Sequence, residues 1–412
     1  RVRLEGDLVA RGPLHVGGVG GSSDVDMALA VDGQGRFVIP GTSLAGALRG
    51  SAKRLFGDTK DLKDLWGSAP GKGQRNSRDH ASRVIIEAAL VTLPAGLLVE
   101  IREGVGIDRC SGTAAEHIKY NRAVLPRGSR IRLSLTIEAP EDQREDVYEL
   151  VGALVRRLKD PGIRIGAART RGLGLVRLEG EAIRGQSLAN RPSTIEALRH
   201  RSSGKGWQDL SGNLPGMGAG SEPWRELQVV VDWKPDGPVM VKAEGAGVAV
   251  DMLPLLSGIG DDESGLAMVI PGSSIKGALR AQAERICRTV TEQDAPKDPD
   301  PRQRFLHQMQ QFCLVEALFG AARKQDQDGD SGSRNLKDVR AGDRPTADEE
   351  ARKANRVLPG VGALAVDDCY ATHAPTSRQQ WSAVESAEDS QDLREALDRA
   401  HLPQVQQAFH VA

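Results

Sequence analysis

The sequence predicts an α+β protein built from two tandem copies of one unit. The phrase VIPGTSLAGALRG at residues 38–50 recurs as VIPGSSIKGALRA at 269–281. Short landmarks flank both copies in the same order: VDM at 25–27 and 250–252, then LWG at 65–67 and LFG at 318–320. Landmarks that recur in the same order indicate a duplicated domain.

Both copies open with the same two elements. Alternating apolar residues predict a strand at 1–10 and another at 226–235. A Pro-Gly turn then leads into a predicted helix in each copy, where Thr42 or Ser273 can serve as the cap.

The rest of the first copy completes the pattern. Strands are predicted at 83–92 and 130–138, and a helix at 143–159. The order β-α-β-β-α with a mainly antiparallel sheet predicts a ferredoxin-like unit. We therefore expect one domain at 1–183 and a second at 226–412.

The segments between and within these domains are poorer in apolar residues. Residues 184–225, rich in Gly, Ser, Pro and Asn, are the expected connector. Residues 291–303 and 324–355 are charged and interrupted by Pro and Gly, so we expect them to be insertions in the second domain.

Composition excludes several classes of protein. The 412 residues are 39% apolar, which fits two to three globular domains, and no apolar run is long enough to span a membrane. The four cysteines (Cys110, Cys287, Cys313 and Cys369) form no CxxC pair. That pattern argues against a disulfide framework and a cysteine zinc site, and it favours the reduced cytoplasm.

The charge of the whole chain does not indicate a nucleic-acid-binding protein. The 55 basic and 56 acidic residues give a net charge of −1. Locally, residues 156–177 carry seven basic side chains against one acid, Asp160, so a basic groove is possible within a neutral total. Aromatic residues are only 3%, which argues against stacking of many bases on aromatic side chains.

The two helix starts are candidate phosphate sites. A helix N-terminus has free backbone N–H groups, and hydroxyls lie beside them here. Basic side chains follow at the spacing that places them on one helix face, Arg49 and Lys53 in one copy and Lys276 and Arg280 in the other. The alternative is an ordinary capped helix with solvated charges.

The segment GIRIGAARTRGLGLVRLEG at 162–180 is a second candidate. It has neither the lysine of a Walker loop nor the strand-turn-helix context of a dinucleotide fingerprint. Its glycines and arginines, among them Gly166, Arg169, Arg171 and Gly172, can instead surround a phosphodiester backbone. The alternative is a surface turn between a helix and a strand.

Asp26 and Asp251, each in a VDM, are candidate catalytic carboxylates. A single carboxylate can position a water, orient a ribose hydroxyl or hold a divalent cation on a phosphate. Their neighbours have equal chemical claims, namely Asp24, Asp32, Asp261 and Asp262. Among the histidines, His15 in the glycine-rich LHVGGVGG is the best candidate to face a ligand.

Taken in order, these motifs resemble those of the RAMP superfamily. The series is LHVGG, VDMALAV, FVIPGTSLAGALRG, LWG, ASRVIIEAAL, GVGIDRCSGTA and GAARTRGLGLVRLE. More narrowly, it resembles the RNA-binding backbone subunits of type III CRISPR effector complexes. The resemblance covers nearly all of the first copy and the first half of the second.

The resemblance implies two modified ferredoxin-like, RRM-related domains with thumb and loop insertions. Such subunits stack along a CRISPR guide RNA, and a thumb, expected within 100–125, splays a base out of the guide–target duplex. A loop aspartate, matched here by Asp26 and Asp251, then cleaves single-stranded target RNA at regular intervals with a divalent cation, expected to be Mg²⁺. Implied RNA contacts are His15, Ser43, Arg49, Arg109, Ser274, Lys276, Arg280 and the loop 166–172.

The chain also departs from the family pattern. Ala45 stands where the second copy has Lys276, and the second copy ends at FHVA (409–412), so we expect that domain to be C-terminally incomplete. Two fused domains suggest a type III-D-like subunit; a type III-E fragment is less favoured, because those chains carry cysteine-rich zinc sites.

Three functions stay open. The first is a guide-binding subunit that cleaves target RNA, with other effector subunits as partners and no membrane contact. The second is a structural guide-binding subunit without cleavage activity. The third is an endoribonuclease that processes CRISPR precursor RNA.

Overall fold

The structure of the protein is a computed structural model. It describes residues 1–18, 25–57, 60–67, 80–199, 206–212, 214–215, 227–245, 247–259, 265–320, 362–372 and 376–400. The chain divides into two compact units, and both halves of the chain contribute to each. The first unit holds Arg1–Glu103, Asn121–Ile270 and Asp368–Ala412, and the second holds Gly104–Tyr120 and Pro271–Asp367. The domain boundaries expected at 183 and 226 stay a prediction.

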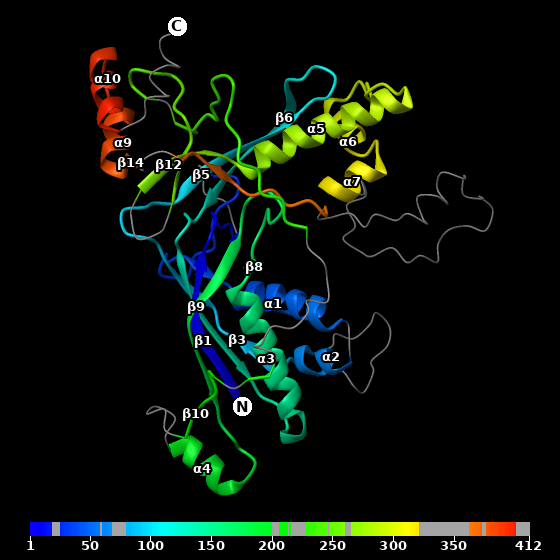
Figure 1. Cartoon of the computed structure of the whole chain (residues 1–412), viewed down its shortest axis with the longest axis vertical. Coiled ribbons are helices and arrows are strands. Elements are labelled where there is room, and N and C mark those ends of the chain that lie inside the picture. The colour runs from blue at the N-terminus through cyan, green and yellow to red at the C-terminus, as the bar shows by residue number, and fades with distance from the viewer. Residues whose placement is uncertain are drawn as a thin grey trace, which may run out of the picture. The chain divides into compact units, whose positions relative to one another are not determined.

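The first unit is centred on an eight-stranded sheet with the strand order β10-β9-β1-β7-β4-β2 (Figure 1). Its central strand β1 (Val2–Ala10) pairs antiparallel with β7 (Arg130–Ile137) on one side and with β9 (Leu175–Gly185) on the other. Alternate residues of β7, from Ile131 to Ile137, are buried, as the period of two in RIRLSLTI requires. The remaining strands are β2 (Val38–Ile39), β3 (Val84–Ile86), β4 (Ala89–Thr92), β8 (Ile163–Arg164) and β10 (Gln208–Asp209).

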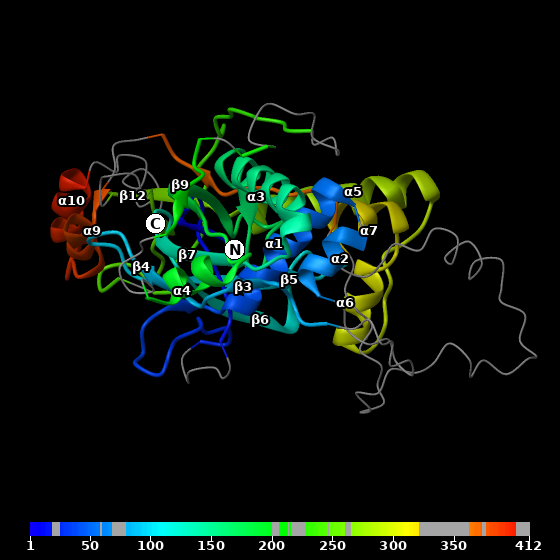
Figure 2. The ribbon, with the colours of Figure 1, turned by 90° about the horizontal axis from the view of Figure 1, so that it is seen from below.

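Two helices cover one face of this sheet. Helices α1 (Gly41–Phe56) and α3 (Arg144–Lys159) lie side by side on it, as Figure 2 shows. Their leucines, including Leu48 and Leu154, join the strand residues in one core cluster. The short α2 (Lys60–Trp66) packs beside α1, the turn η1 (Glu141–Gln143) precedes α3, and α4 (Arg191–Arg199) lies in the expected connector.

The strand order β9-β1-β7-β4 is that of a ferredoxin-like unit, so the predicted fold of the first half is confirmed. Strands 1–10, 83–92 and 130–138 and helix 143–159 are found within a few residues of their predicted bounds. The predicted caps are wrong. Each helix starts two residues earlier, after Pro40 or Pro271, and no side chain caps it, because the preceding proline occupies the N-cap position.

The second half contributes a four-stranded sheet to the first unit. Strand β12 (Gly265–Ile270) pairs with β11 (Leu256–Gly258), β13 (Cys369–Tyr370) and β14 (Thr376–Ser377). Helices α9 (Arg378–Glu385) and α10 (Ser390–Arg399) supply a second core with Trp381, Leu393 and Leu397. The ferredoxin-like strand order does not recur among the described residues of this half.

The strand predicted at 226–235 is wrong for its described part, 227–235. That segment has no regular structure, and Leu227 is 89% and Val230 77% exposed. Its first-half counterpart β1 is hydrogen-bonded on both sides, whereas no described strand pairs with 227–235. Alternation alone does not make a strand, because the backbone groups need a partner chain.

The two halves nevertheless make equivalent strand contacts. In both, the strand that ends in Val-Ile, just before the proline, pairs antiparallel with the same register. The equivalent pairs are Val38–Leu90 and Val269–Tyr370, then Ile39–Ala89 and Ile270–Cys369.

The helices after VIPG also make an equivalent contact. The Arg49 guanidinium donates a hydrogen bond to the Gly67 carbonyl over 3.2 Å, and that of Arg280 donates to Gly320 over 2.8 Å. The two glycines end LWG and LFG, so the recurring landmarks meet in the same way in each half.

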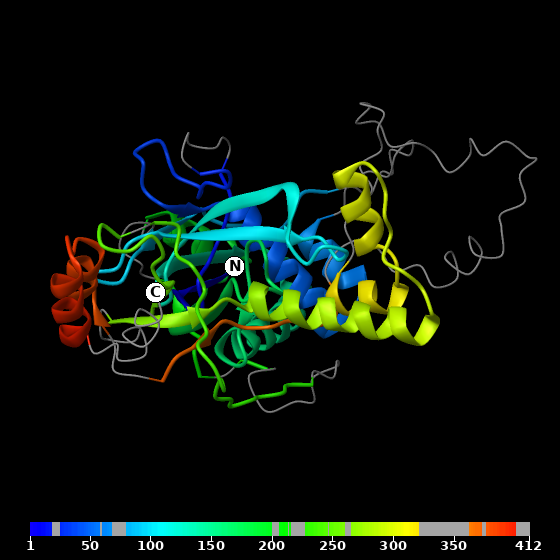
Figure 3. The same ribbon diagram turned by 90° about the horizontal axis from the view of Figure 1, so that it is seen from above.

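A long hairpin follows β4 in the chain, and its residues are divided between the two units. Strands β5 (Glu100–Ile107) and β6 (Ala114–Val124) form a two-stranded sheet, visible as a cyan ribbon in Figure 3. This hairpin occupies the range in which the thumb is expected. The second unit contains its tip and the helices α5 (Gly272–Thr291), α6 (Pro301–Met309) and α7 (Cys313–Phe319). Residues 291–303 are thus partly helical, whereas 324–355 and 409–412 lie outside the described residues.

None of the helices within the described ranges is long and apolar enough to cross a membrane.

Candidate nucleic-acid interface

Asp26 is exposed and is fixed at the base of the hairpin. Its backbone N–H donates to the Asn121 side-chain oxygen over 2.7 Å, and the Asn121 N–H donates to Asp26 Oδ2 over 2.8 Å. The Ala123 N–H donates to the Met27 carbonyl over 3.1 Å, which extends the contact along β6. A loop carboxylate is therefore presented to solvent from a defined position.

A second carboxylate shares this arrangement. The Asn121 side-chain amide donates to Glu244 Oε1 over 3.0 Å, so Asn121 links Asp26 and Glu244. Glu244 comes from the second half of the chain, and no motif pointed to it.

His15 is placed differently from the sequence expectation of a ligand-facing side chain. It is only 4% exposed, and its ring Nδ1 donates to the Ala123 carbonyl over 2.7 Å. Burial lowers the pKa of His15, the bond to Ala123 opposes this, and Arg122 lowers the pKa further, so the ring is held neutral. A buried neutral ring orders β6 beside Asp26 and does not face solvent.

The glycine-rich loop packs against the same segment. The Ala167 N–H donates to the His15 carbonyl over 2.9 Å. Gly166 has φ +75°, and a Cβ there would collide with the His15 carbonyl. Gly172 has φ +90°, and a Cβ there would meet the Asp368 carboxylate. Both glycines thus have a packing role, while Arg169 and Arg171 are half-buried; an RNA contact at this loop stays a prediction.

The amides of Ser43 and Ser274 at the helix starts are already used. The Ser43 N–H donates to the Pro40 carbonyl over 2.9 Å, and the Ser274 N–H donates to Pro271 over 2.8 Å. Their hydroxyl groups differ in access, because Ser274 is exposed and Ser43 is half-buried. Phosphate binding by these two backbone amides would require these turns to open.

The basic side chains after the two starts differ in burial. Arg49 is exposed, although its guanidinium also donates a hydrogen bond to the Gly67 carbonyl. Lys276 is 5% exposed and donates to the Leu364 carbonyl over 2.7 Å, and Arg280, 8% exposed, donates to Glu284 over 2.8 Å. Only the first-half helix therefore presents its arginine toward solvent in this structure.

Arg109 lies at the hairpin tip and is likewise committed to protein. Its side chain is 8% exposed and bonds to Glu284 over 2.5 Å. The neighbouring Asp108 is a buried carboxylate. Burial raises its pKa, but hydrogen bonds from Ser111, Arg304, Cys110 and Gln308 outweigh that and lower the pKa to about 2, so Asp108 stays ionised.

The remaining aspartates differ in what they contact. Asp251 is exposed, and no described residue donates a hydrogen bond to its carboxylate. Asp32 instead accepts from the N–H groups of Gln34 and Arg36, each over 2.9 Å, so it is a turn carboxylate. Asp24, Asp261 and Asp262 lie outside the described residues.

The described residues contain no cluster of three or more His, Cys, Asp or Glu side chains that could hold a metal ion. Mg²⁺ is commonly bound through one or two protein carboxylates together with substrate phosphates. Asp26 and Glu244 each accept a hydrogen bond from Asn121, and binding of a divalent cation there stays a prediction.

Most side chains that organise these sites were missed from the sequence. Asn121, Glu244 and Glu284 belong to no motif, and their roles depend on contacts between segments distant in sequence.

Comparison with known proteins identifies a matching family and similar solved structures. The family model of the RAMP superfamily matches residues 7–177 and 254–368, which is more than half of the chain. A chain in a cryo-EM structure of the type III-B Cmr-beta complex bound to cognate target RNA is similar at 12% identity, with a TM-score of 0.35. That similarity covers 44% of this chain and 60% of the other. No curated protein sequence matches.

Proposed function

From the premise that this chain belongs to the RAMP superfamily, we propose that it binds a CRISPR guide RNA as a backbone subunit of a type III effector complex and cleaves the paired target RNA. Two matched regions, 7–177 and 254–368, and the equivalent contacts of the two VIPG helices support two tandem RNA-binding domains of type III-D-like organisation. Guide RNA, single-stranded target RNA and other effector subunits are the proposed partners.

The observation that carries the cleavage proposal is the position of Asp26. It is exposed, its backbone and carboxylate are both held by Asn121, and Asn121 belongs to the base of the long hairpin. Cleavage by in-line attack of a ribose 2′-hydroxyl needs the ribose turned out of A-form geometry, which a flipped base allows. A hairpin that separates bases beside a fixed carboxylate suits this reaction.

A divalent cation, proposed to be Mg²⁺, would be held by Asp26 and Glu244 together with RNA phosphates. When bound, it would neutralise charge on the scissile phosphate. The carboxylates themselves orient the attacking group, while sequence recognition is left to pairing between guide and target. We propose the corresponding role for Asp251 in the second domain.

A cytoplasmic location is proposed from the unpaired cysteines and the RNA partners. Cys110, Cys287, Cys313 and Cys369 are all free thiols in this structure.

Two other functions make different predictions. A structural subunit would bind guide RNA without cutting target. A precursor-processing enzyme would cut the repeat sequence of a precursor RNA without a bound guide.

Three RNA substrates separate these functions. The full chain, reconstituted with the other effector subunits, is given a precursor RNA alone, guide RNA alone, and target RNA with guide. The proposal expects tight guide binding and target cuts at regular spacing that need Mg²⁺. Precursor cleavage without target cleavage would favour the processing enzyme, and binding without any cleavage would favour the structural subunit. Asp32→Asn, in the same loop region as Asp26, is the matched control and should keep cleavage.

A further inference from the structure

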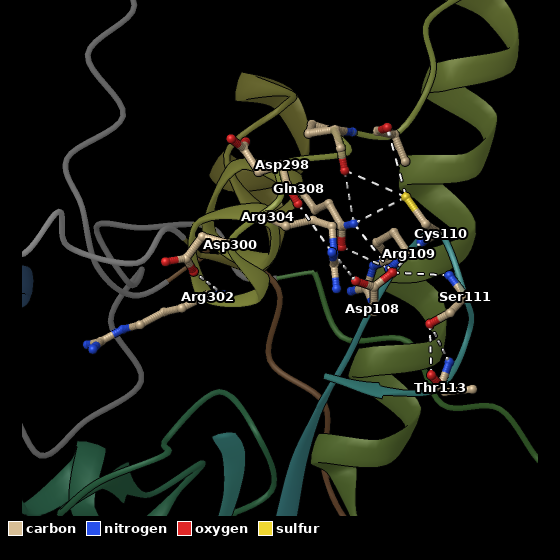
Figure 4. Close-up of polar contacts among 12 residues, drawn as sticks. Asp108, Arg109, Cys110, Ser111, Thr113, Asp298, Asp300, Arg302, Arg304 and Gln308 are labelled. Atoms are coloured by element: carbon tan, nitrogen blue, oxygen red, sulfur yellow. Dashed lines mark hydrogen bonds and ion pairs between the residues drawn. The ribbon is translucent and has the colours of Figure 1, made fainter. Parts of the chain in front are cut away.

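The tip of the β5–β6 hairpin is a closed turn built on Asp108. Its Oδ1 accepts from the Cys110 N–H over 2.7 Å and from the Ser111 N–H over 3.1 Å. The Asp108 N–H donates to the Thr113 carbonyl over 2.9 Å. The turn therefore has a fixed shape, and one carboxylate oxygen, Oδ2, remains for a contact outside the turn (Figure 4).

Helix α6 binds this turn through two side chains. Arg304 Nε donates to Asp108 Oδ2 over 2.8 Å. The Gln308 side-chain oxygen accepts from the Arg109 N–H over 2.8 Å, and its amide donates to the Pro296 carbonyl over 3.3 Å. Gln308 is 1% exposed, so both ends of its amide are used in a buried contact.

Helix α5 binds the next residue of the tip. Glu284 is 1% exposed and accepts from Arg109 over 2.5 Å and from Arg280 over 2.8 Å. Arg280 also donates to the Met309 carbonyl, at the end of α6, over 2.6 Å. The buried carboxylate thus joins the hairpin tip, α5 and the end of α6, and such a carboxylate requires its cationic partners.

These contacts join the two family-matched regions. The tip lies within 7–177, and the helices that hold it lie within 254–368. The first half lacks the corresponding parts. Its helices α1 and α2 are separated only by residues 57–59, with no counterpart of α6, and the position equivalent to Glu284 in the VIPG repeat is Lys53.

We propose that α5 and α6 form a receptor for the hairpin tip, and that Asp108, Glu284 and Gln308 are positioning residues that fix the hairpin for RNA binding. The RNA part of this proposal rests on the proposed function. All of the contacts lie within the second compact unit, so the receptor is defined without reference to the first. In this structure Arg109 and Arg280 both bond to Glu284, and their predicted RNA contacts stay a prediction.

Hydrogen exchange of the full chain without RNA tests the receptor. Asp108→Asn removes the charge that Arg304 binds, and Gln308→Met removes both amide contacts at similar volume. Each is expected to speed exchange of peptides covering 104–113 by roughly ten-fold or more, because the tip opens more often. Asp294→Asn is the matched control. Asp294 lies between α5 and α6 and forms an exposed ion pair with Lys297, so this substitution should leave the exchange of 104–113 unchanged.

Guide-RNA affinity and target-cut positions, measured on the same variants, test the positioning role. We expect weaker guide binding and less regular cuts for Asp108→Asn and Gln308→Met, with thermal unfolding used to confirm that both variants fold. Unchanged exchange at 104–113 in both variants would overturn the receptor. Faster exchange with wild-type affinity and cuts would overturn the positioning role and leave the receptor.

The proposed function fails by a different result. If the wild-type chain neither binds guide RNA nor cuts target, the proposed function and the positioning role both fall, while the exchange data still decide whether α5 and α6 hold the tip.

Discussion

Asn121 and Asp26 hold each other through two hydrogen bonds of opposite direction. Asp26 donates its backbone N–H to the Asn121 side chain over 2.7 Å, and Asn121 donates its backbone N–H to the Asp26 carboxylate over 2.8 Å. The aspartate proposed for cleavage is thus attached to the hairpin strand β6. Its position depends on one side chain that can be changed without touching Asp26.

Replacing Asn121 by Ala tests this dependence. The change removes the bonds to the Asp26 N–H and to Glu244 but keeps the backbone bond to the carboxylate. We expect the cleavage rate to fall about 10-fold to 100-fold with guide affinity unchanged, since small misplacement of a catalytic group has effects of that size. Single-turnover kinetics of target cleavage measure this rate. Asn190→Ala is the control, because Asn190 accepts its hydrogen bond from Ser193 in the connector. If Asn121→Ala cleaved target at the wild-type rate, the position of Asp26 would not depend on the Asn121 side chain.

An added methyl group should destabilise the protein more at Gly166 of the glycine-rich loop than at Gly180 of strand β9. Gly166→Ala places a Cβ against the His15 carbonyl and forces a φ of +75°, so we expect a loss of about 3 kcal/mol in the free energy of unfolding. Gly180→Ala, at φ +60° with open space around the Cβ, has only the backbone strain, about 1 kcal/mol. Denaturant unfolding compares them. Equal losses would show that the contact with His15 does not matter.

The two VIPG helices should respond differently when a basic side chain is removed. Arg49→Gln, at an exposed site, is expected to weaken guide binding and reduce the salt dependence by about one phosphate contact. Lys276→Met leaves the Leu364 carbonyl without its donor and should cost about 1–3 kcal/mol of stability with little change in guide affinity. Affinity titrations over a range of salt, with Arg199→Gln as the exposed control, separate the two. Weaker guide binding by Lys276→Met, with unchanged binding by Arg49→Gln, would contradict this and indicate that Lys276 contacts a phosphate.

His15 should make stability fall in mild acid. Burial lowers the pKa of its ring below 6.5, so below that pH the unfolded chain binds a proton more readily than the folded chain. The contribution of the neutral ring to the free energy of unfolding is complete above pH 6.5, and it is lost as the pH falls from 6.5 through the lowered pKa. His15→Gln, which can still donate to Ala123, should remove this part of the pH dependence, whereas His117→Asn, at an exposed site, should keep it. Identical pH profiles for wild type and His15→Gln would contradict the assignment.

Local sequence patterns were sufficient to predict much of the first half. The alternation in VRLEGDLVA and RIRLSLTI predicts β1 and β7, and their pairing follows from the ferredoxin-like order. The same alternation in LQVVVDWKP failed at 227–235, because a strand also requires a partner that the pattern does not specify.

The roles of the basic residues were harder to predict. Lys276 and Arg280 have the same spacing on their helix as Arg49 and Lys53. However, residues distant in sequence, Leu364 and Gly320, contact Lys276 and Arg280 on α5, whereas Arg49 and Lys53 on α1 remain exposed. No local pattern indicates that Glu284 neutralises Arg109 and Arg280, because these contacts form only when the hairpin tip meets α5. Asp26 became a candidate because its motif recurs, whereas Asn121, which bonds to it, belongs to no motif.

Target-cut mapping on the reconstituted complex, comparing wild type with Asp26→Ala and Asp251→Ala separately, tests the central claim most directly. The proposed function predicts cuts at regular spacing in the wild type, and the loss of one different cut in each variant with guide binding retained. An undiminished cut pattern in both variants would contradict it and leave a guide-binding subunit without these catalytic residues.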